Sequence, residues 1–214
     1  MLGVLGTGCV RAPVHPAIEP AERTVRWRGH RWQMRKPGPP TGAGPTSWSD
    51  APEAVAVHAD QLCLALTRDD QGPWRGAEVW RPVRRRRRVR VRLAPLPDDP
   101  AIVVGVFLYR DDTDELDVEW SRWGEREAPP LQLAVAPRPD APGRRVRLDL
   151  PAPEEVTIHS RRAGPVFRVH SGGQRFTWQL DDPLPGRGPW NLHVNIWPLP
   201  GAVPAGAAQV CLRE

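Results

Sequence analysis

The chain has 214 residues and a formal net charge of +5, and it contains 27 prolines and 19 glycines. This length is enough for one sizeable core, and β-sandwiches of this size are commonly a single domain. No apolar run approaches the roughly 20 residues of a membrane-spanning helix, and no segment shows a long apolar stripe of period 3.6. Because proline and glycine lie between short alternating segments, we expect an all-β chain.

Almost all of the basic residues are arginine, and Lys36 is the only lysine. A skew of this kind is typical of a GC-rich genome, which weakens the arginine content as a sign of nucleic-acid contact. The run from Arg84 to Arg88 has no interleaved aromatic residues on which bases could stack. We therefore expect no nucleic-acid partner.

The first nine residues, Met1 to Cys9, are apolar or small and end in a cysteine. They are similar to the end of a bacterial lipoprotein signal, although no basic residues precede the apolar run. Two interpretations stay open: a truncated signal with a lipid anchor at Cys9, or a short apolar tail. We expect residues 1–23 to be a leader remnant and linker, and the folded domain to span 24–214. The first interpretation predicts a secreted or cell-envelope protein.

Short strands are predicted from Thr24 onward. Residues 24–36 form two strand-like pieces, a Gly/Pro loop at 37–45 leads to Trp48, and residues 54–67 form a hairpin around Ala59-Asp60. This spacing, without an internal repeat, is typical of a sandwich or barrel, and we expect a jelly roll. The remaining strands are expected at 77–82, 86–93, 102–109, 114–120, 131–136, 144–150, 155–160, 165–170, 174–180, 190–197 and 208–213.

Two of the three cysteines, Cys63 and Cys211, lie in predicted strands. In an exported chain they could form a disulfide, and buried free thiols are the alternative. Both alternatives stay open.

The segment Glu115-Leu116-Asp117-Val118-Glu119 places three carboxylates at alternate positions of an aliphatic run. In a strand all three would point to one face. Neighbouring carboxyls repel one another and so keep a proton to higher pH, which suits a general acid. A half-solvated strand is the alternative. The tryptophans that follow, Trp120 and Trp123, favour the catalytic interpretation because indole rings stack on the apolar face of a sugar.

This pentad, the strand Phe107-Leu108-Tyr109 before it and the downstream Asn195-Ile196-Trp197 resemble glycoside hydrolase family 16. The likeness runs from about Trp27 to the C-terminus in the order of elements. The resemblance implies a concanavalin A-like jelly-roll β-sandwich with a concave substrate cleft. It also implies a retaining double displacement: Glu115 attacks the anomeric carbon, Glu119 serves as acid and base, and Asp117 lies between them.

The resemblance also implies substrate-binding positions. Asn195 and Trp197 match residues that contact sugar, by hydrogen bonding and by stacking respectively. Trp48 and Trp123 are further candidates for stacking, and packing in the core is the alternative for all three tryptophans. Because four residues of straight strand span roughly 13 Å and retaining carboxyl groups lie about 5 to 5.5 Å apart, the acidic side chains must converge.

The segment Arg88-Val89-Arg90-Val91-Arg92-Leu93 alternates, which predicts its apolar residues in the core and Arg90 with the other arginines on the opposite face. The resemblance places Arg90 where lichenase-like members have a sugar-contacting glutamate, and Thr113 where they have a tryptophan. We hypothesise that these arginines line one end of the cleft and bind an anionic polysaccharide, because guanidinium pairs with carboxylate or sulfate through two parallel bonds. A solvated face is the alternative.

Together these features predict a monomeric, endo-acting, retaining glycosidase that hydrolyses a polysaccharide of the β-glucan or galactan class and needs no cofactor. The six histidines lack metal-ligand spacing, so we expect no metal site. The alternative is a carbohydrate-binding protein of the cell envelope that has the same fold and no turnover. Intact Glu115, Asp117 and Glu119 favour the enzyme, because a pure lectin gains nothing from crowded carboxylates.

Overall fold

The computed structural model describes residues 23–38, 46–68, 70, 72–83, 88–93, 96–137, 142–161, 163–184 and 189–213. Within these ranges the chain forms β-strands and no helix, so they contain no helix that is long and apolar enough to cross a membrane. The predicted leader with Cys9 and the arginines at 84–87 lie outside the described residues.

The strands follow one another along the chain with short connections. Their bounds are Thr24–Trp27 (β1), His30–Met34 (β2), Ser47–Trp48 (β3), Val55–His58 (β4), Gln61–Arg68 (β5), Trp74–Val83 (β6), Arg88–Leu93 (β7), Ile102–Asp111 (β8), Asp114–Trp120 (β9), Leu131–Val135 (β10), Arg144–Leu148 (β11), Pro153–Arg161 (β12), Gly164–Ser171 (β13), Gln174–Gln179 (β14), Trp190–Pro198 (β15) and Ala208–Arg213 (β16).

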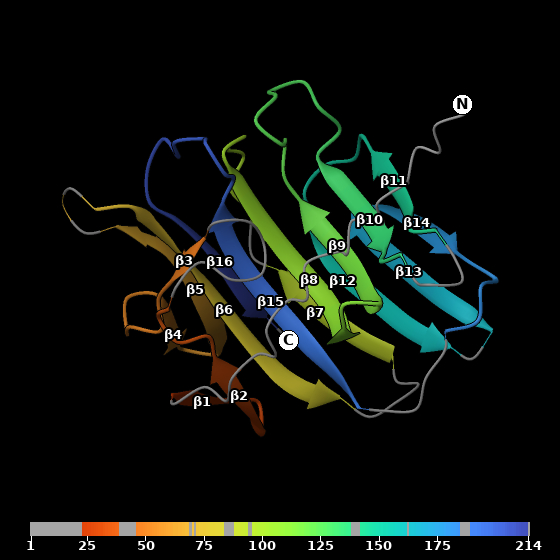
Figure 1. Ribbon diagram of the computed structural model, residues 1–214, viewed down its shortest axis with the longest axis horizontal. Helices are drawn as coiled ribbons and strands as arrows, with labels where there is room; N and C mark the ends of the chain where they lie inside the picture. The colour runs from red at the N-terminus through yellow and green to blue at the C-terminus, as the bar shows by residue number, and fades with distance from the viewer. Residues whose placement is uncertain are drawn as a thin grey trace, which may run out of the picture.

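Two antiparallel sheets make up the fold. The front sheet has the order β11-β10-β9-β8-β15-β6, with β2 and β1 beyond β6, and Figure 1 shows its central strands side by side. The back sheet has the order β4-β5-β16-β7-β12-β13-β14. A short pairing of β5 with β6, from Thr67 opposite Arg75 to Arg68 opposite Trp74, connects the two sheets. The short β3 pairs with β6 in parallel.

The core lies between the two sheets, and strand alternation fills it. On β9 the even-numbered Leu116 and Val118 are buried, and on β7 the buried residues are Val89 and Val91; all four belong to one apolar cluster. The side chains of the odd-numbered residues on β9 therefore point away from the back sheet. This arrangement confirms the all-β prediction and the concanavalin A-like jelly roll.

Most predicted strands are present with ends that differ by a few residues. The hairpin at Ala59-Asp60 is confirmed, with Ala59 in the left-handed region at φ 49°. Strand β6 begins at Trp74, earlier than predicted, because it pairs there with β5 and β3. Strand β3 was not predicted, since two residues are too few to show alternation.

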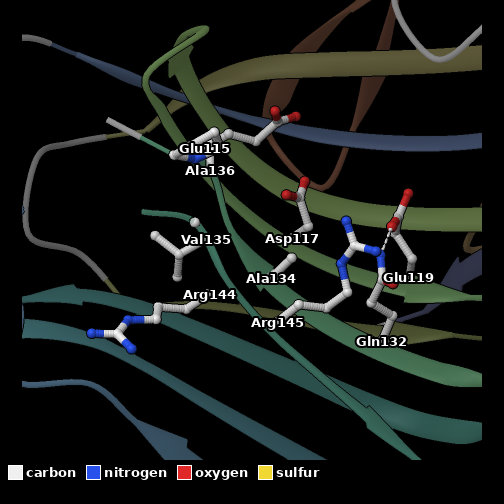
Figure 2. Close-up of a pocket in the computed structure, with 11 residues that line it drawn as sticks. Glu115, Asp117, Glu119, Gln132, Ala134, Val135, Ala136, Arg144 and Arg145 are labelled. Carbon is white, nitrogen blue, oxygen red and sulfur yellow. Dashed lines mark hydrogen bonds between the residues drawn. The ribbon is translucent and has the colours of Figure 1, made fainter. Parts of the chain in front are cut away.

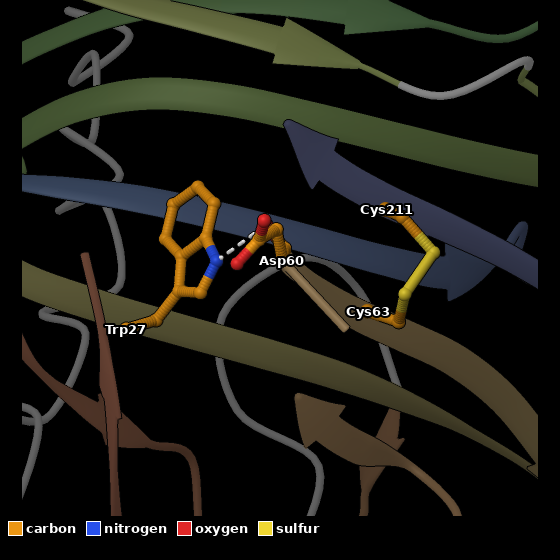
Figure 3. The surroundings of a disulfide bond; sticks show 4 residues. All are labelled: Trp27, Asp60, Cys63 and Cys211. Atoms are coloured by element: carbon orange, nitrogen blue, oxygen red, sulfur yellow. Dashed lines mark hydrogen bonds between the residues drawn. A yellow bond between two sulfur atoms is a disulfide. The ribbon is translucent and has the colours of Figure 1, made fainter. Parts of the chain in front are cut away.

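Cys63 and Cys211 form a disulfide, which decides between the two alternatives for these cysteines (Figure 3). They lie opposite each other on β5 and β16. Their neighbours Leu62 and Leu64 are completely buried in the core, so the disulfide lies on the outer face of the back sheet.

Candidate active site

Strand β9 presents Glu115, Asp117 and Glu119 on the face of the front sheet that points away from the core. These three acids line a pocket of about 670 Å³ (Figure 2). The rest of the lining comes from β10, β11 and the segments next to them: Gln132, Ala134, Val135, Ala136, Pro137, Gly143, Arg144 and Arg145. The pocket therefore extends from the acids toward the β11 edge of the sheet.

Asp117 and Glu115 are hydrogen-bonded to each other, so these two side chains lie close together. Burial raises the pKa of Asp117 well above its usual value, and the charges of Glu115 and Glu119 add to this effect. Burial also raises the pKa of Glu115 to about 7, although the hydrogen bond from Asp117 counteracts it. Asp117 therefore holds the proton and donates it to the Glu115 carboxylate.

Glu119 has different neighbours. Burial raises its pKa, whereas a hydrogen bond from Gln132 and the charges of Arg145 and Arg147 lower it. The Gln132 amide donates to Glu119 Oε2 at 2.6 Å. This contact holds one oxygen of the Glu119 carboxyl group, which lines the pocket.

Strand register places further polar groups beside Glu119. Glu119 is opposite Gly105 on β8, Gly105 is opposite Asn195 on β15, and Asn195 is opposite Glu78 on β6. A Cβ at Gly105 would lie 2.5 Å from Asn195 Oδ1, so only glycine leaves room for the amide here. The structure thus brings Asn195 to the same face as the acids, as predicted.

Glu78 was missed by the sequence analysis and forms the centre of a buried polar cluster. It accepts a hydrogen bond from Arg35 at 2.8 Å, lies 2.9 Å from His193 Nδ1, and is hydrogen-bonded to Asn195. Although burial raises the pKa of Glu78, these partners hold it below its usual value. Among the described residues, His193 Nε2 and Asn195 Oδ1 are buried without a hydrogen-bond partner.

Aromatic rings surround His193 on this face of the sheet. Its ring stacks on Phe107, with centroids 4.7 Å apart, and on Trp80 at 5.8 Å, and Tyr109 meets it edge-on. His193 has no exposed surface. The sheet face over β6 and β15 is therefore more closed than the face over β10 and β11.

The predicted stacking tryptophans gather at one end of the same face. Trp48 and Trp197 pack together with Val103, and Trp123 packs against them. Trp48 is 2% exposed and Trp197 is 6% exposed, which leaves little ring surface for a sugar and favours the packing alternative for both. Trp123 is half-buried, with the Arg147 guanidinium 5.1 Å from its ring centre.

The prediction that Arg90 lines the cleft is wrong. Its alternation is as expected, but β7 belongs to the back sheet, where Arg90 points to the outer face and forms an ion pair with Glu155. The acids and Arg90 thus lie on opposite outer surfaces of the sandwich. The proposed match of Arg90 to a sugar-contacting glutamate fails for the same reason.

Arginines of a different strand reach the pocket side. On β11, Arg145 is opposite Ala134 and Arg147 is opposite Gln132, and those two residues are in turn opposite Asp117 and Glu119. Val146 and Leu148 face the core. The alternation of residues 144–148 was visible in the sequence, but it does not tell to which sheet the strand belongs.

No family model matches the chain, and no curated protein matches its sequence. Solved structures match its fold. An immunostimulatory antigen and pseudo β-1,3-glucanase of Mycobacterium tuberculosis is similar over 85% of this chain and 88% of that one, with a TM-score of 0.67 and 15% identity. A lichenase from a mouse hindgut metagenome has a TM-score of 0.59 and 18% identity, over 85% of this chain and 92% of that one.

A family 16 glycoside hydrolase from Bacteroides ovatus, solved with a glucan product, is also similar. The match covers 85% of this chain and 92% of that chain, with a TM-score of 0.62 and 12% identity. At these identities the likeness concerns the fold. The chain has the fold of the glycoside hydrolase family 16 β-glucanases.

Proposed function

We propose that this protein is a retaining glycoside hydrolase that cleaves a polysaccharide within the pocket on β9–β11. The observation that carries the proposal is the acid triad: Glu115, Asp117 and Glu119 lie on one face and line one pocket, and Asp117 shares a proton with Glu115. The similar fold of the Bacteroides ovatus enzyme, which was solved with a glucan product, supports a polysaccharide substrate, for which we propose the β-glucan or galactan class.

The first step forms a covalent intermediate. The Glu115 carboxylate attacks the anomeric carbon while Glu119 gives its proton to the departing glycosidic oxygen, so that bond breaks as the glycosyl-enzyme ester forms. The hydrogen bond from Asp117 favours the ionised form of Glu115 before the attack and partly offsets the effect of burial. Glu119 has two opposed influences, because burial favours its protonated form and Arg145 with Arg147 favours release of the proton.

The second step returns the enzyme to its starting state. Glu119, now ionised, takes a proton from a water molecule, and the oxygen of that water attacks the anomeric carbon. The ester bond to Glu115 breaks and its carboxylate is released. No other proton donor is needed, because the proton that Glu119 takes from water replaces the one that left with the leaving group.

A carbohydrate-binding protein without turnover is the second candidate. Two observations favour it: the sheet face over His193 is closed, and a protein of similar fold is described as a pseudo β-1,3-glucanase. The half-buried triad with its raised carboxyl pKa values favours the enzyme, because such groups are costly for folding and are typical of catalytic sites.

The deciding experiment compares the full chain with Glu115→Gln and Glu119→Gln variants on neutral and acidic β-glucans and galactans, with reducing ends as the readout. Cleavage that falls at least 10³-fold in both variants supports the glycosidase. Binding without cleavage by the unchanged protein supports the carbohydrate-binding alternative. The Asp117→Asn variant serves as a milder change in the same pocket.

We also propose that the protein works outside the cytoplasm. The Cys63–Cys211 disulfide supports this location, since such bonds persist mainly in oxidising compartments. To test the location, the chain is expressed with and without an export signal and its free thiols are labelled. Labelling of both Cys63 and Cys211 in the exported protein would contradict the proposal.

A further inference from the structure

Two exposed arginines that take no step in the proposed chemistry lie beside the acids: Arg145 lines the pocket, and Arg147 is opposite the pocket residue Gln132. Arg145 and Arg147 stand at alternate positions of β11, the edge strand of the front sheet, on the face that bears the acids. Residues two apart in a strand are separated by roughly 7 Å, so the two guanidinium groups form a basic edge along one side of the pocket.

Among the described residues Arg145 forms no salt bridge, although its charge counteracts the raised pKa values of Asp117 and Glu119. Arg144 forms an ion pair with Asp182, and Arg122 forms one with Asp98. Within the described residues, by contrast, the Arg145 guanidinium makes neither a hydrogen bond nor a salt bridge, and it lines the pocket (Figure 2). Arg147 donates only to Gln132 Oε1, at 3.3 Å, while covering Trp123. Donors thus remain available at both guanidinium groups.

The acids beside Arg145 are poor partners for it. Asp117 holds its proton, so it carries no full negative charge, and Glu119 is held by Gln132. A guanidinium group that faces an open pocket and has unused N–H donors offers a forked set of donors to an anion from solution. The basic edge therefore suits a ligand that brings its own negative charge.

We propose that Arg145 and Arg147 form an anion-binding subsite, and that the polysaccharide bound in this pocket carries carboxylate or sulfate groups that reach β11. The inference rests on the proposed function, because it assumes that the pocket binds a polysaccharide. It assigns the preference for anionic sugars to β11, after the structure removed Arg90 from the cleft.

The test measures binding, so that it does not depend on turnover. The full chain carrying Glu115→Gln is titrated by calorimetry with lichenan, carboxymethylated lichenan and sulfated lichenan, and with agarose and κ-carrageenan. The modified glucans differ from their parent only in charge, and the two modifications distinguish carboxylate from sulfate. The same titrations are made with Arg145→Gln, Arg147→Gln and Arg168→Gln added.

Arg168→Gln is the matched control, because it removes the same charge from β13, which lies in the back sheet far from the acids. We expect at least one charged polymer to bind tenfold more tightly than its neutral parent. Arg145→Gln should abolish this preference and Arg147→Gln should reduce it, whereas Arg168→Gln should leave it unchanged. Arg145→Lys should restore part of it, since it keeps the charge without the forked geometry.

Equal affinity for charged and neutral polymers, no binding of any charged polymer, or equal losses in the Arg145 and Arg168 variants would overturn the inference. The two proposals fail separately. If the unchanged protein cleaves nothing but the preference for charged polymers depends on Arg145, the subsite is supported and the glycosidase proposal is rejected. Cleavage of polysaccharide by the unchanged protein, together with equal affinity of the Glu115→Gln chain for charged and neutral polymers, keeps the glycosidase and rejects the subsite.

Discussion

Proton sharing among neighbouring carboxyls controls the chemistry of single residues in this site. Asp117 is the donor toward Glu115, and the attack that we propose for Glu115 requires its ionised form. With the pKa of Glu115 near 7, the rate should rise as the pH increases through about 7. Because the three carboxyls interact, the apparent pKa of this acidic limb of the pH–rate profile describes the three carboxyls together.

Changing Asp117 should move this limb in a predictable direction. Asp117→Ala removes the donor, so Glu115 should become harder to ionise and the acidic limb of kcat should shift to higher pH, with kcat reduced about 10²-fold. Asp117→Asn keeps an N–H donor and should shift the limb less. Profiles of kcat between pH 4 and 9 check the prediction, and equal shifts in the two variants would contradict it.

The same residues should weaken the fold at neutral pH. A carboxyl whose pKa is higher in the folded than in the unfolded chain adds stability at low pH, and this stability is lost as the pH rises from the unfolded value to the folded one. For Glu115 the window runs from about 4.5 to about 7. The free energy of unfolding should therefore fall across this range.

Glu115→Gln should remove this loss. We expect the variant to be more stable than the unchanged chain by up to about 3 kcal/mol at pH 8, and to show little gain at pH 4. Urea unfolding at the two pH values measures the difference. A gain that is the same at both would show that the carboxyl group is not responsible.

At the scale of strands, alternation identified the face of each residue but not the sheet to which a strand belongs. Residues 88–93 and 144–148 show similar arginine alternation, yet one strand lies in the back sheet and the other borders the pocket. The acid triad could be predicted because all three residues share one strand. The Glu78–His193–Asn195 cluster could not, because it depends on the pairing of β6 with β15, about 115 residues apart in the chain.

Strand packing also separates the tryptophans into two kinds. Trp48 on β3 is 2% exposed. Trp48→Ala should lower the free energy of unfolding by about 3 to 5 kcal/mol, since a large buried ring is lost. Trp123 is half-buried in a loop, so Trp123→Ala should lower the free energy of unfolding less than Trp48→Ala does. Urea unfolding of both variants, with polysaccharide binding in parallel, tests this. Unchanged stability with lost binding in Trp48→Ala would restore the stacking role.

The whole molecule joins distant parts of the chain in its back sheet. Strand β16, at the C-terminal end, pairs with β5 near the start of the fold, and the disulfide connects them across a sequence separation of 148. In the unfolded chain this bond would close a very long loop, which lowers the entropy of the unfolded state. The core on one side of these strands and the disulfide on the other therefore stabilise the same pairing.

Removing the disulfide should destabilise the fold without affecting the pocket. We expect the Cys63→Ala/Cys211→Ala variant to lose about 2 to 5 kcal/mol of unfolding free energy, and the unchanged chain to lose a similar amount after reduction. Guanidinium unfolding with and without dithiothreitol measures both losses, and the double variant is the control because the reductant should not change its stability.

Polysaccharide binding at 25 °C should persist in all folded forms, since the disulfide lies on the outer face of the back sheet and the acids lie on the front sheet. Binding lost together with the disulfide, in protein that is still folded, would show that the two sheets are coupled.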